Sequence, residues 1–419
     1  MDPRSTIAEP HVLILGGGFG GVAALKALKK TPVRVTGIDK NGYQTFQPLL
    51  YQVATDELSV DEVGFPLRNL LRGHPRWAFH CAAVTAIDLE KKQVTVEGLP
   101  PLTYDYLVLA LGAVVNFFGI KGAAEHAYPL YTLRDAVRLK AHVLKAFEAA
   151  DKDPSRVDDG ALTVCVVGGG ATGVEVAGAL AELIRYELKD DYPGLPMEKA
   201  EVVLYEMGHE LLKPFKPKLR AYAKRALEKL GVRVCLGEGV VEIDATRVHL
   251  KSGGVVKAHT LVWGAGLQPN PLTGSLGIPL VHGRVPVGAD LSLAGHPNVF
   301  VVGDAAVAMD AKSGQPLPQL GSVAKQAGRA AGRNIASLVA GQPSRPFRYL
   351  DRGTMATIGR GAAVVELPWG MTLTGFVAWL SWLFVHLGLL AGGVEKSLTL
   401  RDWVWNLLTR RRGKRIVIE

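Results

Sequence analysis

Cysteine is the scarcest chemically active residue in this chain, with three copies among 419 residues. Cys81, Cys165 and Cys235 lie far apart, and none of them belongs to a CxxC or CxxxxC pair. This spacing excludes a disulfide framework and is typical of a protein from a reducing compartment. Cys165 lies in an apolar run, so we expect a small core residue there, and we interpret the other two in the same way.

Charged residues are also few, at 21% of the chain, and a secretory signal is lacking. Residues 1–10 are polar, and the apolar run at residues 12–15 is short and ends in glycines. Neither extended disorder nor a cleaved leader is therefore expected. We also expect no metal site.

Glycine and apolar residues, by contrast, are abundant: there are 48 glycines, and 48% of the residues are apolar. Residues 12–15, 22–30 and 33–38 have the patterns of a strand, a helix and a strand. The same order returns within residues 163–205, where the helix should end near Leu188. Two such βαβ units predict an α/β fold with two Rossmann-like dinucleotide-binding domains.

The first βα turn carries the pattern G-x-G-x-x-G at residues 16–21. Gly16 allows the tight turn, Gly18 lets a pyrophosphate approach the backbone, and Gly21 allows the helix to pack closely on the strand. The free N–H groups of the helix N-terminus would bind the phosphates. Asp39, 18 residues beyond Gly21, can accept hydrogen bonds from ribose hydroxyls.

The second turn repeats this spacing with Gly168, Gly170 and Gly173, and Glu206 takes the ribose position. A carboxylate there would repel a 2′-phosphate, which favours NADH over NADPH, although Lys213 and Arg220 follow and temper that preference. A lone glycine motif is weak, but here it occurs twice in the order strand, glycines, helix, strand, acid. The sequence therefore predicts two occupied dinucleotide sites.

Asp304 directly follows Gly303 at the end of an apolar strand pattern at residues 299–302. A carboxylate at the end of a core strand is costly unless it is paired. The ribityl hydroxyls of a flavin would pair with it, whereas NAD has no ribityl chain. The alternative is a helix N-cap, since residues 319–336 are predicted to form a helix.

On these motifs the chain resembles the two-dinucleotide-binding-domain flavoproteins of glutathione-reductase type. Within them it is similar to the type II NADH:quinone oxidoreductases. The most specific matching blocks are Pro-Leu-Leu-Tyr-Gln at residues 48–52 and Met-Ala-Thr-Ile-Gly at residues 355–359. The other matching blocks are residues 16–21, 46–55, 109–113, 168–175, 262–266 and 303–304.

The resemblance implies FAD as the cofactor of the first unit and NADH as the substrate of the second. Its flavin contacts fall on Gly16, Gly18, Gly21, Asp39, Ala110, Gly112 and Asp304. Its NADH contacts fall on Gly168, Gly170, Gly173, Glu206 and Gly266. Hydride would pass from NADH to FAD, and two electrons would then pass to a membrane quinone, ubiquinone or menaquinone. Disulfide reductases and sulfide:quinone oxidoreductases need a cysteine pair, and this chain has none.

The predicted domain organisation follows from these assignments. The FAD-binding domain comprises residues 1–125 and 271–345, and the NADH-binding domain comprises residues 161–270. Residues 126–160 form a connecting helix and linker. Residues 346–419 form a C-terminal region that faces the quinone and anchors the protein to a membrane.

Glu175 and Gln326 are the predicted catalytic residues. Glu175 is expected in the first turn of its helix, where an acid stabilises the helix dipole. The resemblance implies a further role near the nicotinamide and flavin rings, either tuning the flavin or relaying a proton toward quinol formation. The quinone region is predicted to contain Pro48, Tyr51, Gln52, Ser322, Gln326 and Ile358. The family pattern Ala-Gln-x-Ala-x-Gln here reads Gly-Ser-Val-Ala-Lys-Gln at residues 321–326. Ser322 would reach a quinone carbonyl only through water, and Gln326 could instead contact the flavin ring or the backbone.

The C-terminal region contains 28 consecutive residues, 367–394, without a charged side chain. This run is long enough for a membrane span, but a soluble core helix and a helix pair lying in the membrane plane are alternatives. Trp403 and Trp405 then lie between Arg401 and the basic cluster at residues 410–415, a combination that suits an anionic bilayer surface. We expect peripheral, monotopic attachment at the cytoplasmic face of the cell membrane and no nucleic-acid partner.

Too few apolar segments are present for a proton channel, so the predicted reaction does not pump protons. Two alternatives stay open: a soluble NADH-dependent flavoprotein oxidase or reductase, and a redox-sensing flavoprotein of the apoptosis-inducing-factor type. The type of quinone and the oligomeric state are also open, and a homodimer is one option.

Overall fold

The computed structural model describes residues 9–409 of the chain. They form two compact units, each assembled from segments that are distant in the sequence. Unit 1 comprises residues 9–44, 66–114 and 267–350, and unit 2 comprises residues 45–65, 115–266 and 351–409. The predicted α/β class is confirmed, since each unit contains its own mostly parallel sheet with helices packed on it.

Unit 1 is built on a six-stranded sheet in the order β21-β22-β9-β1-β2-β5. The bounds of these strands are β21 Ser292–Leu293, β22 His296–Val301, β9 Tyr106–Leu109, β1 His11–Leu15, β2 Arg34–Asp39 and β5 Trp77–Cys81. β1 pairs in parallel with both β2 and β9. Every residue of β1 is buried, as a central parallel strand requires, and the strand predicted at residues 12–15 is confirmed.

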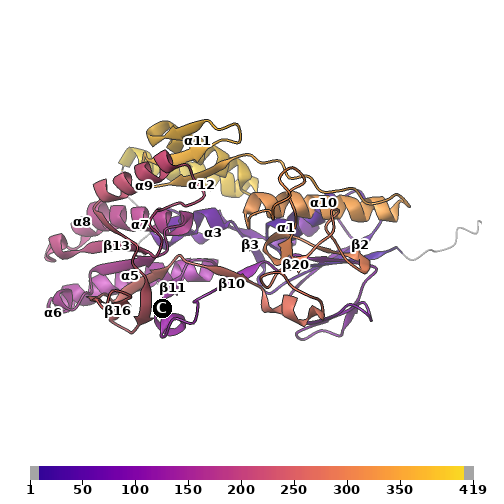
Figure 1. Ribbon diagram of the computed structural model, residues 1–419, viewed down its shortest axis with the longest axis horizontal. Coiled ribbons are helices and arrows are strands. Elements are labelled where there is room, and N and C mark those ends of the chain that lie inside the picture. The colour runs from indigo at the N-terminus through magenta and orange to yellow at the C-terminus, as the bar shows by residue number, and fades with distance from the viewer. Residues whose placement is uncertain (1–8, 410–419) are drawn as a thin grey trace, which may run out of the picture. The chain divides into compact units, whose positions relative to one another are not determined.

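Alternate residues of β1 enter two different cores, because successive side chains point to opposite faces. Val12 and Ile14 pack under α1 (Phe19–Ala27) and α10 (Gly321–Val339), which lie side by side (Figure 1). Leu13 and Leu15 pack against a small antiparallel sheet. That sheet consists of β6 (Val84–Asp88), β7 (Gln93–Val96) and β8 (Leu102–Thr103).

Unit 2 repeats this plan on the sheet β11-β18-β12-β13-β14. Its strands are β11 Tyr128–Pro129, β18 Thr260–Trp263, β12 Thr163–Val167, β13 Glu201–Glu206 and β14 Val232–Leu236. Cys165 and Tyr205 point into a core closed by β15 (Val240–Ile243), β16 (Arg247–Leu250) and β17 (Val255–Lys257). The helices α5 (Leu133–Lys152), α7 (Ala171–Leu183) and α9 (Pro217–Lys229) pack on the same unit.

The helix predicted to end near Leu188 does reach that residue, but only with a change of geometry. α7 ends at Leu183, and Ile184–Leu188 continues it as a π-helix before α8 (Lys189–Asp191). The polar stretch 151–160 contains the end of α5 and the short helix α6 (Ser155–Asp158).

The C-terminal part of unit 2 begins with an antiparallel sheet of β24 (Thr354–Thr357), β25 (Ala363–Glu366) and β26 (Thr372–Thr374). α11 (Gly375–Leu389) and α12 (Gly393–Thr409) follow, and α12 packs on the short helix α3 (Val60–Val63) (Figure 1). The uncharged run at residues 367–394 is therefore a turn, a strand and one helix. Leu390, in an extended conformation, ends that helix. No helix within residues 9–409 is both long and apolar enough to cross a membrane.

Candidate active site

The first glycine turn, between β1 and α1, is shaped so that only glycine fits at two of its positions. Gly16 has φ +106°, and a Cβ there would lie 2.1 Å from the carbonyl oxygen of Ala110. A Cβ on Gly21 would lie 1.8 Å from the carbonyl oxygen of Gly16. Gly18 differs, because a Cβ there would meet nothing within 4 Å. Gly18 is also the N-cap of α1 without a side-chain cap, so open space faces free helix N–H groups, as phosphate binding needs.

Asp39 at the end of β2 fixes the conformation of this turn. Its carboxylate accepts hydrogen bonds from the backbone N–H of Gly17 at 2.6 Å and of Asn41 at 2.7 Å. Burial raises the pKa of Asp39, while these two backbone donors act in the opposite direction. Each carboxylate oxygen keeps a further lone pair, which can accept a ribose hydroxyl.

The second turn, between β12 and α7, reproduces this arrangement in unit 2. Gly168 has φ +109°, a Cβ on Gly173 would lie 1.8 Å from the carbonyl oxygen of Gly168, and Gly170 faces open space. Glu206 accepts hydrogen bonds from the N–H of Gly169 at 2.5 Å and of Gly208 at 2.6 Å. The structure thus places all the predicted members of the two turns together, each turn with its own carboxylate.

Arg220 does not contribute a free positive charge beside Glu206. Its guanidinium pairs with the carboxylate of Glu210 and donates to the carbonyl oxygens of Lys213 and Phe215. Because these bonds occupy the guanidinium of Arg220, this side chain is not free to bind a 2′-phosphate.

The other predicted flavin contacts lie at the strand ends of unit 1. Ala110 and Gly112 follow β9, and Gly112 has φ +67°. Asp304 lies in the 3-10 turn η6 (Gly303–Ala305) directly after β22, and burial raises the pKa of its carboxyl. Within the described residues that carboxylate makes no hydrogen bond. A half-buried carboxylate at the end of β22, without a hydrogen bond among the described residues, fits the ribityl hydroxyls of a flavin.

Gly266, the remaining predicted nucleotide contact, follows β18 in unit 2 and has φ +74°. A Cβ on Gly266 would lie 2.3 Å from the ring of Phe118. The backbone N–H of Asn116 donates to the carbonyl of Gly266 at 3.2 Å, and the indole N–H of Trp263 donates to the carbonyl of Asn116 at 3.0 Å. Neither Asn116 nor Phe118 was predicted, because nothing in their local sequence marks them.

Glu175 does not lie where the sequence placed it. α7 begins at Ala171, its first turn contains no acidic residue, and Glu175 belongs to the second turn. Its side chain is buried, and the backbone N–H of Thr357 donates to its Oε1 at a long 3.4 Å. Burial raises the pKa of Glu175 to about 8, so the carboxyl is mostly protonated at neutral pH. Favourable interaction with the helix dipole would lower this pKa, so the dipole does not account for Glu175.

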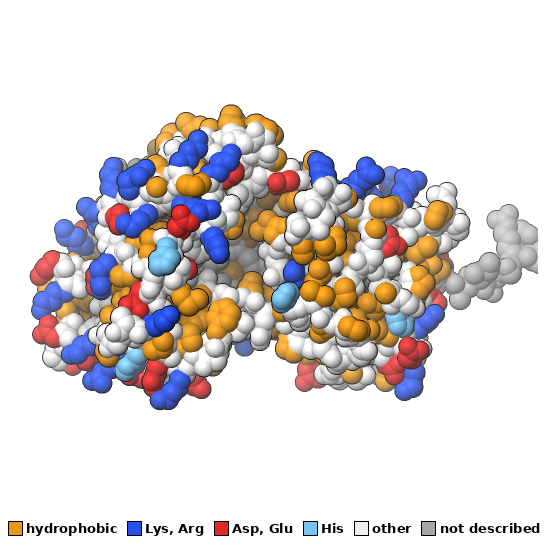
Figure 2. Space-filling model, in the orientation of Figure 1, with side chains coloured by type: hydrophobic (Ala, Val, Ile, Leu, Met, Phe, Trp, Pro, Cys, Tyr) orange, Lys and Arg blue, Asp and Glu red, His pale blue; other side chains and the backbone are white. Residues whose placement is uncertain are grey.

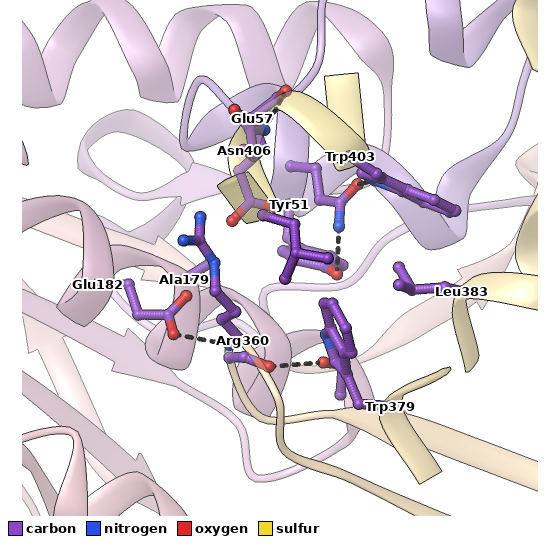
Figure 3. A pocket seen from close by; sticks show the side chains of 13 residues that line it. Tyr51, Glu57, Ala179, Glu182, Arg360, Trp379, Leu383, Trp403 and Asn406 are labelled. Atoms are coloured by element: carbon purple, nitrogen blue, oxygen red, sulfur yellow. Dashed lines mark hydrogen bonds between the residues drawn. The ribbon is translucent and has the colours of Figure 1, made fainter. Parts of the chain in front are cut away.

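A pocket in unit 2 brings the predicted quinone residues Tyr51 and Gln52 together with the C-terminal helices (Figure 3). It encloses about 460 Å³ of empty space, including the part that opens to solvent. The remaining lining residues are Glu57, Ala179, Glu182, Thr357, Gly359, Arg360, Trp379, Leu383, Trp403, Asn406 and Leu407. Pro48 lies in η1 (Gln47–Leu49), just before α2 (Leu50–Ala54). Ile358 is fully buried, and its neighbours in the sequence, Thr357 and Gly359, both line the pocket.

Glu182 and Arg360 form a polar side of this pocket that sequence reasoning missed. The backbone N–H of Arg360 donates to the carboxylate of Glu182 at 2.7 Å, and both side chains lie on the same side of Tyr51 in Figure 3. The sequence did contain a signal for Glu182, because this residue follows Glu175 by seven positions and so lies on the same face of the helix.

Ser322 and Gln326 lie on α10 in unit 1, where their polar groups are engaged. The hydroxyls of Ser322 and Tyr349 are 3.0 Å apart. The amide of Gln326 donates to the carbonyl of Leu350 at 2.9 Å and accepts from its N–H at 3.0 Å. In this structure Gln326 therefore contacts the backbone, which was one of the two alternatives to a quinone contact.

The three cysteines are all free thiols. Cys165 is buried in β12, and burial raises the pKa of its thiol to about 12. Such a thiol does not form the thiolate that redox or nucleophilic chemistry needs.

α11 and α12 expose an apolar surface, here called the apolar face. α12 buries polar residues, among them Asp402 and Asn406, and turns most of its apolar residues outward, with Trp403 as a buried exception. Hydrophobic side chains line the outer edge of α11 in Figure 2. The members of the apolar face that are at least 38% exposed are Phe376, Val377, Leu380, Phe384, Val385, Val394, Leu400, Val404, Trp405, Leu407 and Leu408. The predicted basic cluster at residues 410–415 lies outside the described residues.

Comparisons with known proteins agree with this architecture. Residues 10–328 match the pyridine nucleotide-disulphide oxidoreductase family, and residues 352–412 match the NDH2 C-terminal domain. The chain is 38% identical to the type II NADH:quinone oxidoreductase Ndh of Mycobacterium tuberculosis, over 99% of this chain and 92% of that protein. It is 32% identical to the Staphylococcus aureus enzyme, over 83% and 87%. The fold matches NDH2 from Plasmodium falciparum in complex with NADH, with a TM-score of 0.89 at 22% identity, over 98% and 100% of the two chains. The chain belongs to the type II NADH:quinone oxidoreductases, a family of FAD-dependent enzymes.

Proposed function

We propose that unit 1 holds FAD on the Gly16–Gly21 turn and that unit 2 binds NADH on the Gly168–Gly173 turn. The observation that supports this proposal is that each unit has the same glycine turn, held by a carboxylate of its own. This carboxylate is Asp39 in unit 1 and Glu206 in unit 2. Bound FAD supplies a hydride acceptor that can return two electrons to a quinone. Since the chain holds no cysteine pair, it offers no alternative route through a disulfide.

The residues of this chain then have three tasks. The two turns bind the pyrophosphates, and Glu206 selects NADH because its carboxylate repels a 2′-phosphate. Asp304 orients the ribityl chain. The pocket of unit 2 receives the quinone ring among Trp379, Leu383 and Trp403, and its polar groups contact the quinone oxygens.

Gly170→Ala is the test of this assignment. The added methyl would meet no protein atom within 4 Å, so the fold should persist, but the methyl occupies the space where the pyrophosphate approaches. The purified variant should contain a normal amount of flavin. Its KM for NADH, measured in steady-state assays, should be raised at least tenfold. Reoxidation of the reduced flavin by a ubiquinone or menaquinone analogue should stay at the wild-type rate.

Gly18→Ala is the matched control, since Gly18 also faces open space at its turn. That variant should instead lose flavin during purification. Equal effects of the two substitutions on flavin content would contradict the assignment of one cofactor to each turn. Flavin that NADH reduces but no quinone analogue reoxidises would contradict the quinone as acceptor.

We further propose that the apolar face seats the enzyme on the cytoplasmic surface of an anionic membrane. The polarity of α12 is reversed relative to a soluble surface helix, because four of its five buried residues are polar and most of its apolar residues are exposed. This arrangement is stable only where the outside is itself apolar, in lipid or in another protein. NADH is an intracellular reductant, which places the face on the cytoplasmic side.

The double variant Phe384→Ser and Leu408→Ser tests this attachment. These side chains are 80% and 77% exposed, so their removal should not disturb the core. Burial of each is worth roughly 1.5–3 kcal/mol, so binding to phosphatidylglycerol vesicles should weaken more than tenfold in a sedimentation assay. Val255→Ser, on an exposed strand of unit 2, should leave vesicle binding unchanged. If the double variant instead dissociates a dimer and still binds vesicles, the face is a subunit interface.

A further inference from the structure

The pocket of unit 2 contains a buried chain of hydrogen bonds that starts on the C-terminal helix. The indole N–H of Trp403 on α12 donates to Oε1 of Gln52 on α2 at 2.9 Å. Nε2 of Gln52 donates to the hydroxyl oxygen of Tyr51, also at 2.9 Å. The three side chains are between 4% and 9% exposed, and all of them line the pocket. Trp403 and Gln52 lie 351 residues apart in the sequence, so only the fold brings them together.

The direction of this chain is fixed by the chemistry of its first member. An indole nitrogen can donate a hydrogen bond but cannot accept one. Gln52 must therefore turn its carbonyl oxygen toward Trp403, which leaves its NH₂ group facing Tyr51. Because an amide NH₂ is only a donor, the hydroxyl oxygen of Tyr51 must accept, and its own proton must point elsewhere.

The proton of Tyr51 is available to a ligand. In the described part of the chain the hydroxyl has no hydrogen bond other than the one that it accepts from Gln52. Tyr51 lies centrally among the labelled lining residues, with Trp403, Trp379 and Leu383 around it (Figure 3). Burial raises the pKa of Tyr51 well above its usual range, and the carboxyls of Glu57, Glu175 and Glu182 raise it further, so the hydroxyl keeps its proton.

Packing holds the three side chains in place. Trp382 on α11 is 1% exposed, and its ring centroid lies 6.2 Å from that of Tyr51 and 6.1 Å from that of Trp403. The carbonyl oxygen of Tyr51 also accepts a bond from the Thr55 hydroxyl at 2.9 Å. A hydroxyl with a locked ring and a defined proton direction is preorganised to bind an oxygen acceptor.

We propose that Tyr51 donates a hydrogen bond to a carbonyl oxygen of the quinone, and that Trp403, acting through Gln52, is the positioning residue that sets its direction. This inference rests on the proposed quinone site. It gives α12 a second task besides membrane attachment, because undocking of α12 would release Gln52 and with it the orientation of Tyr51. Only a hydrogen bond is proposed, and no proton leaves Tyr51.

The test compares Tyr51→Phe, Trp403→Phe and the double variant in the FAD-loaded full chain. The acceptors are a short-chain ubiquinone or menaquinone analogue, whichever wild type reduces faster, and ferricyanide, which has no carbonyl oxygen. Each single variant should lower kcat/KM for the quinone about three- to tenfold, the loss expected for one neutral hydrogen bond. Reduction of the flavin by NADH and of ferricyanide by the enzyme should be unchanged.

The double variant separates positioning from independent action. If Trp403 acts through Tyr51, adding Trp403→Phe to Tyr51→Phe should cause no further loss. Additive losses would overturn the relay. Trp369→Phe, in the turn between β25 and β26 and 74% exposed, is the matched control and should behave as wild type.

The outcomes also distinguish this inference from the function on which it rests. Quinone reduction by wild type with no loss in Tyr51→Phe overturns the inference and keeps the function. Failure of wild type to reduce any quinone analogue, with normal reduction of ferricyanide, overturns the function itself. Melting temperature and flavin content of each variant show whether a loss reflects folding.

Discussion

Replacing Glu175 by glutamine should lower turnover with NADH and quinone about 100-fold at pH 7, the lower end of what a positioned acid or base contributes. Glutamine has nearly the same shape and can still accept the hydrogen bond from the backbone N–H of Thr357. It cannot release or take up a proton, however, and we propose that Glu175 relays one during quinol formation. Stopped-flow measurement of flavin reduction and reoxidation should show which half-reaction is slowed, with FAD still bound.

The pH dependence should change together with the rate. Because burial raises the pKa of Glu175 to about 8, the wild-type carboxyl is protonated below that pH and ionised above it. Wild-type turnover should therefore fall as the pH rises through about 8, whereas Glu175→Gln should show no transition there. Glu187→Gln, another buried glutamate of the same helical segment, should keep the wild-type profile. Wild-type turnover in Glu175→Gln would rule out the relay.

Stability should change in the direction opposite to activity. A glutamate whose folded pKa is raised destabilises the fold as the pH rises from the unfolded value of 4.5 to about 8, at about 1.4 kcal/mol per pKa unit. Glu175→Gln removes this buried charge and should raise the free energy of unfolding by a few kcal/mol at pH 9, with little change at pH 4. A variant that is slower yet more stable at alkaline pH excludes misfolding as the cause of the slow turnover.

The two nucleotide turns were predictable because their information is local. Gly16, Gly18 and Gly21 are required by contacts within one βα turn, and β2 delivers Asp39 to that turn by the ordinary right-handed βαβ path. The same holds for the second unit and Glu206. A pattern read within about 40 residues therefore predicted both the strands and the carboxylate that closes each turn.

The quinone-side pocket was predictable only in part, because its walls come from distant segments. Tyr51 and Gln52 were expected there, but their partner Trp403 had been interpreted only as a membrane-interface residue. Glu175 was displaced by one turn because the sequence does not mark where α7 begins. Gln326 was expected at the quinone, yet its amide is bound to the backbone of Leu350, a contact that spacing cannot reveal.

The apolar C-terminal run illustrates a different limit. Length and hydropathy alone leave a span, a core helix and an in-plane helix pair equally open for residues 367–394. The strand β26 lies in the first part of the run, and α11 ends before Leu390. The run is therefore not one continuous helix. The reversal of polarity in α12 also needs tertiary contacts, because Asp402 and Asn406 become buried only by packing on unit 2.

The change with the largest expected effect on stability is Lys140→Met. The ammonium of Lys140 on α5 lies 2.5 Å from the carboxylate of Asp56, whose side chain is 1% exposed. Asp56 has φ +65° and ends the segment that carries Tyr51 and Gln52. Removing one partner of a buried ion pair costs about 3–5 kcal/mol. Urea unfolding followed by circular dichroism should show a loss of this size, and quinone reduction should weaken as α2 loosens.

Two companion variants identify the origin of that loss. Adding Asp56→Asn to Lys140→Met should restore more than half of the lost free energy of unfolding, because the buried charge is gone and asparagine tolerates a positive φ. Lys91→Met, which breaks the exposed pair with Asp88 at 3.1 Å, should change stability by less than about 1 kcal/mol. If Lys140→Met and Lys91→Met cost the same, the Lys140–Asp56 pair does not hold α2 on α5, and the pocket must be fixed from the α12 side through Trp403.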